Sequence, residues 1–224
     1  MLRRIFLVLI TCLLFANCKH HHEISEEEKK EIISELAEIK RLDQKFAGMP
    51  PSELREEYGH ERAWEIFELQ RDSVGLINQR KIKALYEQYG YLGEQEIGKE
   101  ASTDFWLPIQ HADNDIPFQQ EMLKALESIL TEGSNDLVHY AMLEDRINVN
   151  LGRPQRFGSQ LTYNNNGQAI PKYGLVDSTK VDSLRRNYLL PNFKVYYNDM
   201  TRMHFEMNKE YLLEEGITKP LLYK

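Results

Sequence analysis

The chain has 224 residues, of which 42% are hydrophobic, enough apolar material for one domain with a sizeable core. Its formal charge of −7 excludes the usual nucleic-acid-binding domain, which needs a basic surface. The spacing of apolar residues predicts a mostly α fold, a compact multi-helix domain over residues 25–224 with one β-hairpin.

The first residues have the composition of an export signal. Two arginines precede a run over residues 5–16 that is almost wholly apolar but too short to span a bilayer. The run leads into Asn17-Cys18, which resembles the cleavage site of bacterial lipoproteins. The resemblance implies a signal peptide over residues 1–17 and a lipid on Cys18. The alternative is an ordinary secretory signal that is cut near the same place.

Cysteine usage favours lipidation. Cys12 would be removed with the signal peptide, so Cys18 would be the one cysteine left and no intramolecular disulfide could form. Acylation would explain this unpaired cysteine. We therefore expect an exported lipoprotein of the bacterial cell envelope. It would be anchored at Cys18, and the expected membrane is the outer membrane. Residues 18–24, with their three histidines, are expected to form a solvated tether.

Two long helical stretches come first. One begins at Ser25, which can form a capping box with Glu28, and ends before Gly48. The other is expected to run from Ser52 to Tyr89 as a single helix with a bend at Gly75. Its expected inward-facing residues are Trp64, Phe67, Leu69, Val74, Ile77, Ile82 and Leu85.

Two further helices flank a polar break. The first contains residues 105–109 and is expected to hold Pro108 near its first turn, where a missing N–H costs little. The second follows Asp115, an expected N-cap, with Pro117 near its start and Gly133 at its end.

Asn135 is expected to cap the next helix, which ends before a Gly-x-Pro-Gln loop. The helical pattern of apolar residues stops after this loop. Residues 160–170 then predict a β-hairpin, because their Asn-Gly pair suits a turn that needs positive φ. A helix capped at Asp177 or Ser178 follows, and another begins after Pro191. The tail beyond it is weakly patterned.

Residues 110–160 place polar side chains of catalytic type beside apolar ones, which indicates a partly buried polar site. His111 is a candidate general base, since histidine titrates near neutral pH. Asp113 and Asp145 are candidates for the carboxylate that orients it. Arg146 could hold an anionic group of a substrate, or could pair structurally with Asp113. The glutamines could orient a ligand or satisfy loop backbone groups; they are Gln110, Gln119, Gln155 and Gln160.

The same stretch gives little support for metal or covalent chemistry. The His-x-Asp-x-Asp run at 111–115 lacks the spacing of a zinc motif, so no metal site is predicted. No serine or cysteine nucleophile signature accompanies these residues. The cofactor is left open.

The combined motifs resemble a bacterial family known only as a domain of unknown function. The resemblance covers roughly residues 36–200 and departs from the family at Tyr91-Leu92, where Trp-Pro is usual, and at Ser159, where Thr is usual. It implies one fold and the location of a site, without an activity. The residues that carry it are Asp43-Gln44, Asp72, Asn78, Tyr89-Gly90, Gly98, the run 110–113, Phe118-Gln119, Asp145-Arg146, the loop 152–160, Asp177, Val181-Asp182, and Arg185 or Arg186.

Two kinds of function fit these observations. The first is a hydrolase or group-transfer enzyme on a polar or anionic small substrate, with His111 as base and Arg146 stabilising negative charge. The second is a non-catalytic binding module of the cell envelope. In that case the polar residues form a buried hydrogen-bond network, and the partner surface lies elsewhere, on the acidic helices at 25–62.

Overall fold

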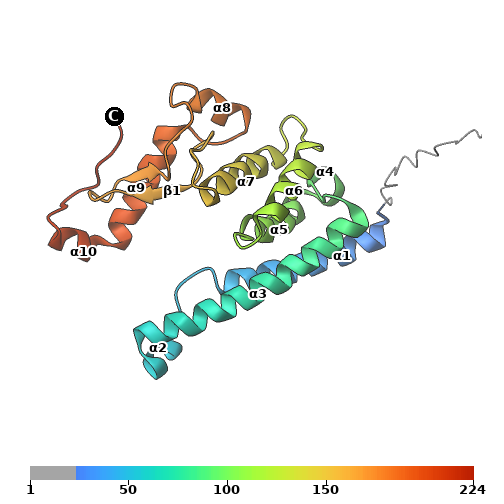
Figure 1. Ribbon diagram of the computed structural model, residues 1–224, viewed down its shortest axis with the longest axis horizontal. Helices are drawn as coiled ribbons and strands as arrows, with labels where there is room; N and C mark the ends of the chain where they lie inside the picture. The colour runs from blue at the N-terminus through green and yellow to red at the C-terminus, as the bar shows by residue number, and fades with distance from the viewer. Residues whose placement is uncertain (1–23) are drawn as a thin grey trace, which may run out of the picture.

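The computed structural model describes residues 24–224. The expected signal peptide, Cys18 and the three histidines of the tether lie outside these residues. Within the described part, the chain forms ten helices and one two-stranded antiparallel hairpin (Figure 1). The mostly α fold class with a hairpin after the Gly-x-Pro-Gln loop is therefore confirmed.

Two long helices lie side by side along one edge of the molecule (Figure 1). They are α1 (Glu26–Lys45) and α3 (His60–Tyr89), with the short α2 (Ser52–Tyr58) packed against α3. The start of α1 is as predicted, because the Ser25 hydroxyl accepts from the Glu28 N–H and the Glu28 carboxylate accepts from the Ser25 N–H.

The prediction of one helix from Ser52 to Tyr89 is wrong. Gly59 has a φ of 77°, in the left-handed region that glycine adopts most easily, and it separates α2 from α3. Two expected inward residues are also on the surface, since Leu69 is 68% exposed and Ile77 is 42% exposed. These residues are helical as predicted, but neighbouring helices cover only part of α3.

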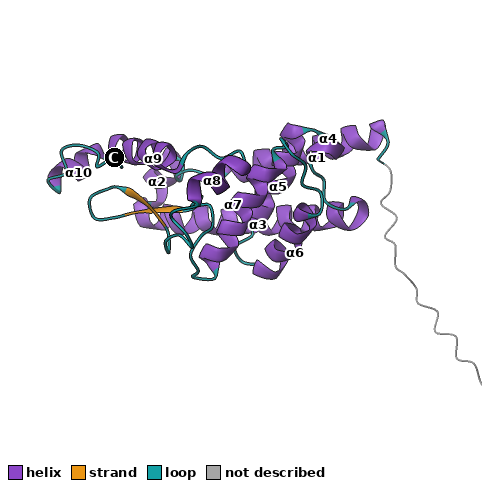
Figure 2. Cartoon of the chain, turned by 90° about the horizontal axis from the view of Figure 1, so that it is seen from above, coloured by secondary structure: helices purple, strands orange, loops and turns teal. Residues whose placement is uncertain are grey.

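The centre of the fold is α5 (Lys99–Gln110), which contacts α1, α3, α6, α7 and the short α4 (Glu94–Ile97). Next to it, α6 (Ile116–Glu127) packs on α7 (Asp136–Asn150), and these helices gather in the middle of the molecule (Figure 2). The core between them consists of fully buried side chains, among them Phe105, Ile109, Met122, Leu126 and Leu143.

Pro108 lies in the last turn of α5, so its expected place in the first turn is wrong. The helix already starts at Lys99. Because proline cannot donate to the carbonyl four residues earlier, it favours the end of the helix at Gln110. The chain then turns, and α6 begins as predicted: the Asp115 carboxylate accepts from the Phe118 N–H at 3.1 Å.

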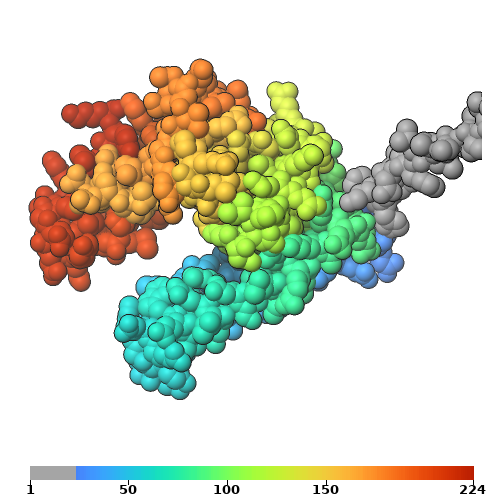
Figure 3. Space-filling view, viewed as in Figure 1, coloured from blue at the N-terminus to red at the C-terminus, as the bar shows by residue number. Residues whose placement is uncertain are grey.

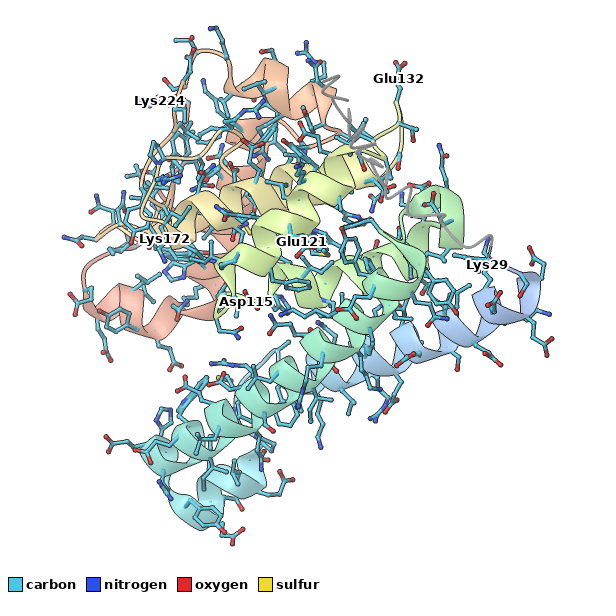
Figure 4. The ribbon with its side chains drawn as sticks, turned by 45° about the vertical axis from the view of Figure 1, so that its right-hand side comes forward. Lys29, Asp115, Glu121, Glu132, Lys172 and Lys224 are labelled. Carbon is cyan, nitrogen blue, oxygen red and sulfur yellow. The ribbon has the colours of Figure 1, made fainter. Side chains whose placement is uncertain are left out.

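Asp115 also ties α6 to α3 (Figure 4). Its carboxylate accepts from Lys83 at 2.8 Å and from Gln79 at 2.9 Å. The start of α6 is thus fixed against the middle of α3, and the turn between α5 and α6 is held over that helix.

Three expected helix ends differ from the structure. α6 ends at Glu127, well before Gly133. Asn135 precedes α7 but has helical φ and ψ, so its side chain does not cap; the Ser134 hydroxyl accepts from Asp136 N–H instead. α8 (Val181–Asn187) begins later than predicted because Asp177 accepts from Thr179 within the preceding turn.

The C-terminal part packs around the hairpin of β1 (Leu161–Tyr163) and β2 (Ala169–Pro171). Gly167, with a φ of 67°, supplies the positive dihedral in its turn. The long α9 (Phe193–Met207) contacts β2, and α10 (Lys209–Glu214), which the weak pattern did not reveal, contacts α9. No helix among residues 24–224 combines the length and apolar composition needed to cross a membrane.

Candidate functional site

A cleft of about 710 Å³ opens where four parts of the chain meet: the end of α1, the middle of α3, the α5–α6 turn and α7. His111, Asp113 and Arg146 line it together. In the space-filling view, the arm of α2 and the start of α3 stands apart from the C-terminal segment and leaves a notch between them (Figure 3). The volume lies in the range of small-molecule sites.

His111 closes α5 and turns its ring toward the last turn of α1. Its Nδ1 lies 2.9 Å from Oδ1 of Asp43, whose side chain is only 11% exposed. A carboxylate accepts the proton of Nδ1, so the neutral ring carries its lone pair on Nε2. No residue in the described part of the chain hydrogen-bonds to this Nε2, which leaves it available to a ligand in the cleft.

Asp113 and Arg146 form a two-point ion pair across the cleft. Nε of Arg146 donates to Oδ1 of Asp113 at 2.8 Å and Nη2 donates to Oδ2. Asn150 donates to the same carboxylate at 2.7 Å. Burial raises the pKa of Asp113, but the hydrogen bonds from Arg146 and Asn150 outweigh it and lower the pKa overall. Arg146 is therefore engaged within the protein, as the structural interpretation expected.

Asp145 does not line the cleft. Adjacent residues of a helix point about 100° apart, so Asp145 faces the other side of α7, where it is fully buried. Its carboxylate accepts from the main-chain N–H groups of Arg156, Phe157 and Ser159, at 2.8, 3.2 and 2.8 Å. Burial raises the pKa of Asp145, and these three donors partly offset the effect. The hypothesis that it orients His111 lacks geometric support, because Asp43 occupies that position.

The opposite side of the same loop is held by Arg185, the buried member of the Arg185-Arg186 pair. Its Nε donates to the Pro191 carbonyl at 2.6 Å. Its Nη1 donates to the carbonyls of Phe157 and Gly158, at 2.7 and 3.1 Å. The loop 156–159 thus lies between two buried charged groups. Its N–H groups donate to the Asp145 carboxylate, and its carbonyls accept from the Arg185 guanidinium.

Gln155 has a structural place as well. It is fully buried, and its Nε2 donates to the carbonyls of Gln160 and Lys172, both at 2.7 Å. Its Oε1 accepts from the Gln160 N–H at 2.8 Å. Gln160 approaches the cleft through one contact, since its Oε1 accepts from Arg146 at 3.2 Å.

Gln119 and Gln110 are buried beneath the α5–α6 turn. Nε2 of Gln119 donates to the Ile109 carbonyl at 3.1 Å, and Nε2 of Gln110 donates to the Met142 carbonyl at 3.5 Å. Gln110, Gln119 and Gln155 therefore donate to backbone carbonyls, whereas the side chain of Gln160 bonds to the side chains of Arg146 and Ser159.

The sequence-based set of site residues missed the wall of the cleft that α3 provides. Arg71, Asp72, Gly75 and Asn78 all line it. Asp72 and Asn78 belong to the motifs of the resemblance, yet they lie far along the chain from the polar run at 110–160. No group of three or more His, Cys, Asp or Glu side chains within residues 24–224 is arranged to hold a metal ion.

Residues 56–204 match the family of unknown function DUF6624. The chain belongs to this family. Neither the curated proteins nor the solved structures give a match. The DUF6624 segment contains the α3 wall, the α5–α6 turn, α7 and the hairpin, while Asp43 lies before it.

Proposed function

We propose that the cleft is the active site of a hydrolase that acts on a small polar or anionic substrate. One observation carries this proposal: His111 lies in the cleft with Nδ1 bonded to Asp43 and with Nε2 unoccupied by the described residues. A histidine held in this tautomer by a largely buried carboxylate is suited to general acid–base catalysis.

The chemistry needs water as the nucleophile. Nε2 of His111 takes a proton from a water molecule as the water oxygen forms a bond to a carbonyl or phosphoryl centre. When the bond to the leaving group breaks, the leaving group takes the electron pair and receives the proton from Nε2. Asp43 keeps the ring in place and stabilises its cationic form. Transfer to another acceptor would follow the same steps, with that acceptor in place of water.

The test is a hydrolysis screen of the full chain against chromogenic carboxylic esters, phosphate esters and peptides. For the substrate that is turned over, His111→Gln is expected to lower kcat/KM by about 100-fold, the usual loss when a general base is removed. Asp43→Asn should lose about tenfold, since the ring keeps a weaker partner.

His60→Gln is the matched control, because His60 lies on the surface at the start of α3, outside the cleft. Full turnover in His111→Gln would exclude the role of His111 as base. Saturable binding without turnover would favour the non-catalytic binding module.

We also propose that the protein is an exported lipoprotein held on the outer membrane by a lipid on Cys18. The support is the basic and apolar sequence before this cysteine and the short stretch of residues 19–25 between it and α1. A single acyl chain binds membranes weakly, so more than one would be needed for stable anchoring.

Metabolic labelling with palmitate tests the anchor. The wild-type chain should incorporate label and Cys18→Ala should not, while Cys12→Ala, in the apolar run, should behave like wild type. Equal labelling of Cys18→Ala would contradict the assignment. Fractionation of the labelled wild-type protein tests whether it resides in the outer membrane.

A further inference from the structure

The wall of the cleft on α3 has features that the hydrolytic chemistry does not use. Arg71, Gly75 and Asn78 follow one another at spacings of four and three, so they share one face of the helix. All three line the cleft. At 1.5 Å of rise per residue, Arg71 and Asn78 are about 10 Å apart along the helix axis, with Gly75 between them.

Asn78 provides a buried acceptor without a donor. It is fully buried, and its Nδ2 donates to the Ile39 carbonyl at 3.2 Å. Because a carbonyl can only accept, this contact identifies the atom facing it as nitrogen. Oδ1 is therefore the atom that has no hydrogen-bond partner in the described structure. A buried acceptor in this state favours a ligand that brings an N–H or O–H group.

Gly75 leaves space in front of the helix. Apart from its own turn of the helix, no atom lies within 4 Å of the place that a Cβ atom would take. Glycine in a helix interior is unfavourable compared with alanine, so the fold gains nothing locally from its presence. A large side chain at this position would project into the cleft between Arg71 and Asn78.

The two charged residues at this wall are weakly engaged. The Arg71 guanidinium lies 3.5 Å from Glu68, and both side chains are about half exposed. No residue within 24–224 forms a hydrogen bond or ion pair with Asp72. Arg71 can therefore pair with an anionic group of a ligand. The negative charge of Asp72 favours a ligand with a cationic donor over one with a neutral donor.

We propose that the α3 wall binds a zwitterion of amino-acid type, a short peptide or an amino-acid conjugate. The carboxylate lies at Arg71, and the ammonium group donates to Oδ1 of Asn78, with the negative charge of Asp72 about 9 Å away along the helix axis. Two extended residues span up to about 7 Å, and the arginine side chain covers the remaining distance. This inference names the substrate class of the proposed hydrolase and rests on that function only in placing the bond to be cleaved near His111.

Binding is measured without turnover, on the full chain carrying His111→Gln. The probes are a mixed library of free dipeptides, the same dipeptides with an acetylated N-terminus, and the same dipeptides with an amidated C-terminus. Free dipeptides at millimolar concentration are expected to raise the melting temperature. Capping either end should weaken binding about tenfold, because each cap removes one charge-assisted contact.

Variants of the wall complete the test. Gly75→Leu should abolish binding by filling the open space, whereas Ser73→Leu, exposed on the same helix and outside the cleft, should not. Arg71→Gln should weaken free dipeptides and leave the amidated ones unchanged.

The inference is overturned if no free dipeptide binds, if capped dipeptides bind equally well, or if Gly75→Leu binds like wild type. If dipeptides bind the wild-type chain but not Gly75→Leu, and the wild-type chain hydrolyses nothing, the subsite is supported and the proposed hydrolase function is contradicted. If other substrates are hydrolysed, and this activity is lost in His111→Gln but kept in Gly75→Leu, the hydrolase function is supported and the dipeptide subsite is contradicted.

Discussion

Asp145→Ala is expected to lower the free energy of unfolding by about 3–5 kcal/mol, because three main-chain N–H groups, two of them on buried residues, would lose their acceptor. The carboxylate is fully buried and bonds to the N–H groups of Arg156, Phe157 and Ser159. For a domain of this size the loss corresponds to a fall in melting temperature of about 6–20 °C. Urea unfolding of the full chain gives the free energy directly.

Two further variants frame this result. Asp145→Asn keeps one acceptor oxygen but sets an amide N–H₂ against one of the donors, so an intermediate loss is expected. Asp199→Ala removes a carboxylate that pairs with Arg202 on the surface of α9, and it should change stability by less than about 0.5 kcal/mol. If Asp145→Ala were as stable as Asp199→Ala, the three N–H contacts would have no net stabilising role.

Arg185→Met is expected to cost about 2–5 kcal/mol. The change leaves the carbonyls of Phe157 and Pro191 without their buried donor. The Gly158 carbonyl keeps a partner, since the Tyr197 hydroxyl donates to it at 3.0 Å. Burial lowers the pKa of Arg185, so the variant also removes a charge that is costly to bury, and this gain limits the loss.

Arg186→Met is the matched control, because Arg186 is the exposed neighbour on the same helix. Its melting temperature should stay close to that of wild type. Arg185→Lys should fall between the two variants, since one ammonium group cannot reproduce the planar fork that reaches three carbonyls. Equal stability of Arg185→Met and Arg186→Met would show that the buried guanidinium is dispensable.

Local signals predicted much of the fold. The capping box at Ser25, the Asp115 cap and the Asn-Gly hairpin each depend on residues close in sequence. The errors arose where the same signal has two outcomes. Proline is tolerated in a first turn but also favours the end of a helix, as at Pro108, and a glycine such as Gly59 either continues a helix or breaks it.

The site was less accessible to sequence reasoning. The polar stretch at residues 110–160 contributes His111, Asp113 and Arg146 to the lining of the cleft, but its density of polar residues could not show which of them face the cleft and which face the interior. Asp145 and Arg146 are adjacent in the chain, yet Asp145 bonds to the buried loop 156–159 and Arg146 lines the cleft. The partner of His111 came from α1, through a contact between residues 68 positions apart, and a single sequence contains no signal for such a contact.

The adjacency of Asp145 and Arg146 also restricts how the molecule can move. One residue fixes α7 to the loop 156–159, and the next fixes it to the α5–α6 turn through Asp113. Any rotation or sliding of α7 would displace both contacts at once. A ligand that shifts α7 on binding to Arg146 would therefore also have to move the loop 156–159, and with it the hairpin that follows.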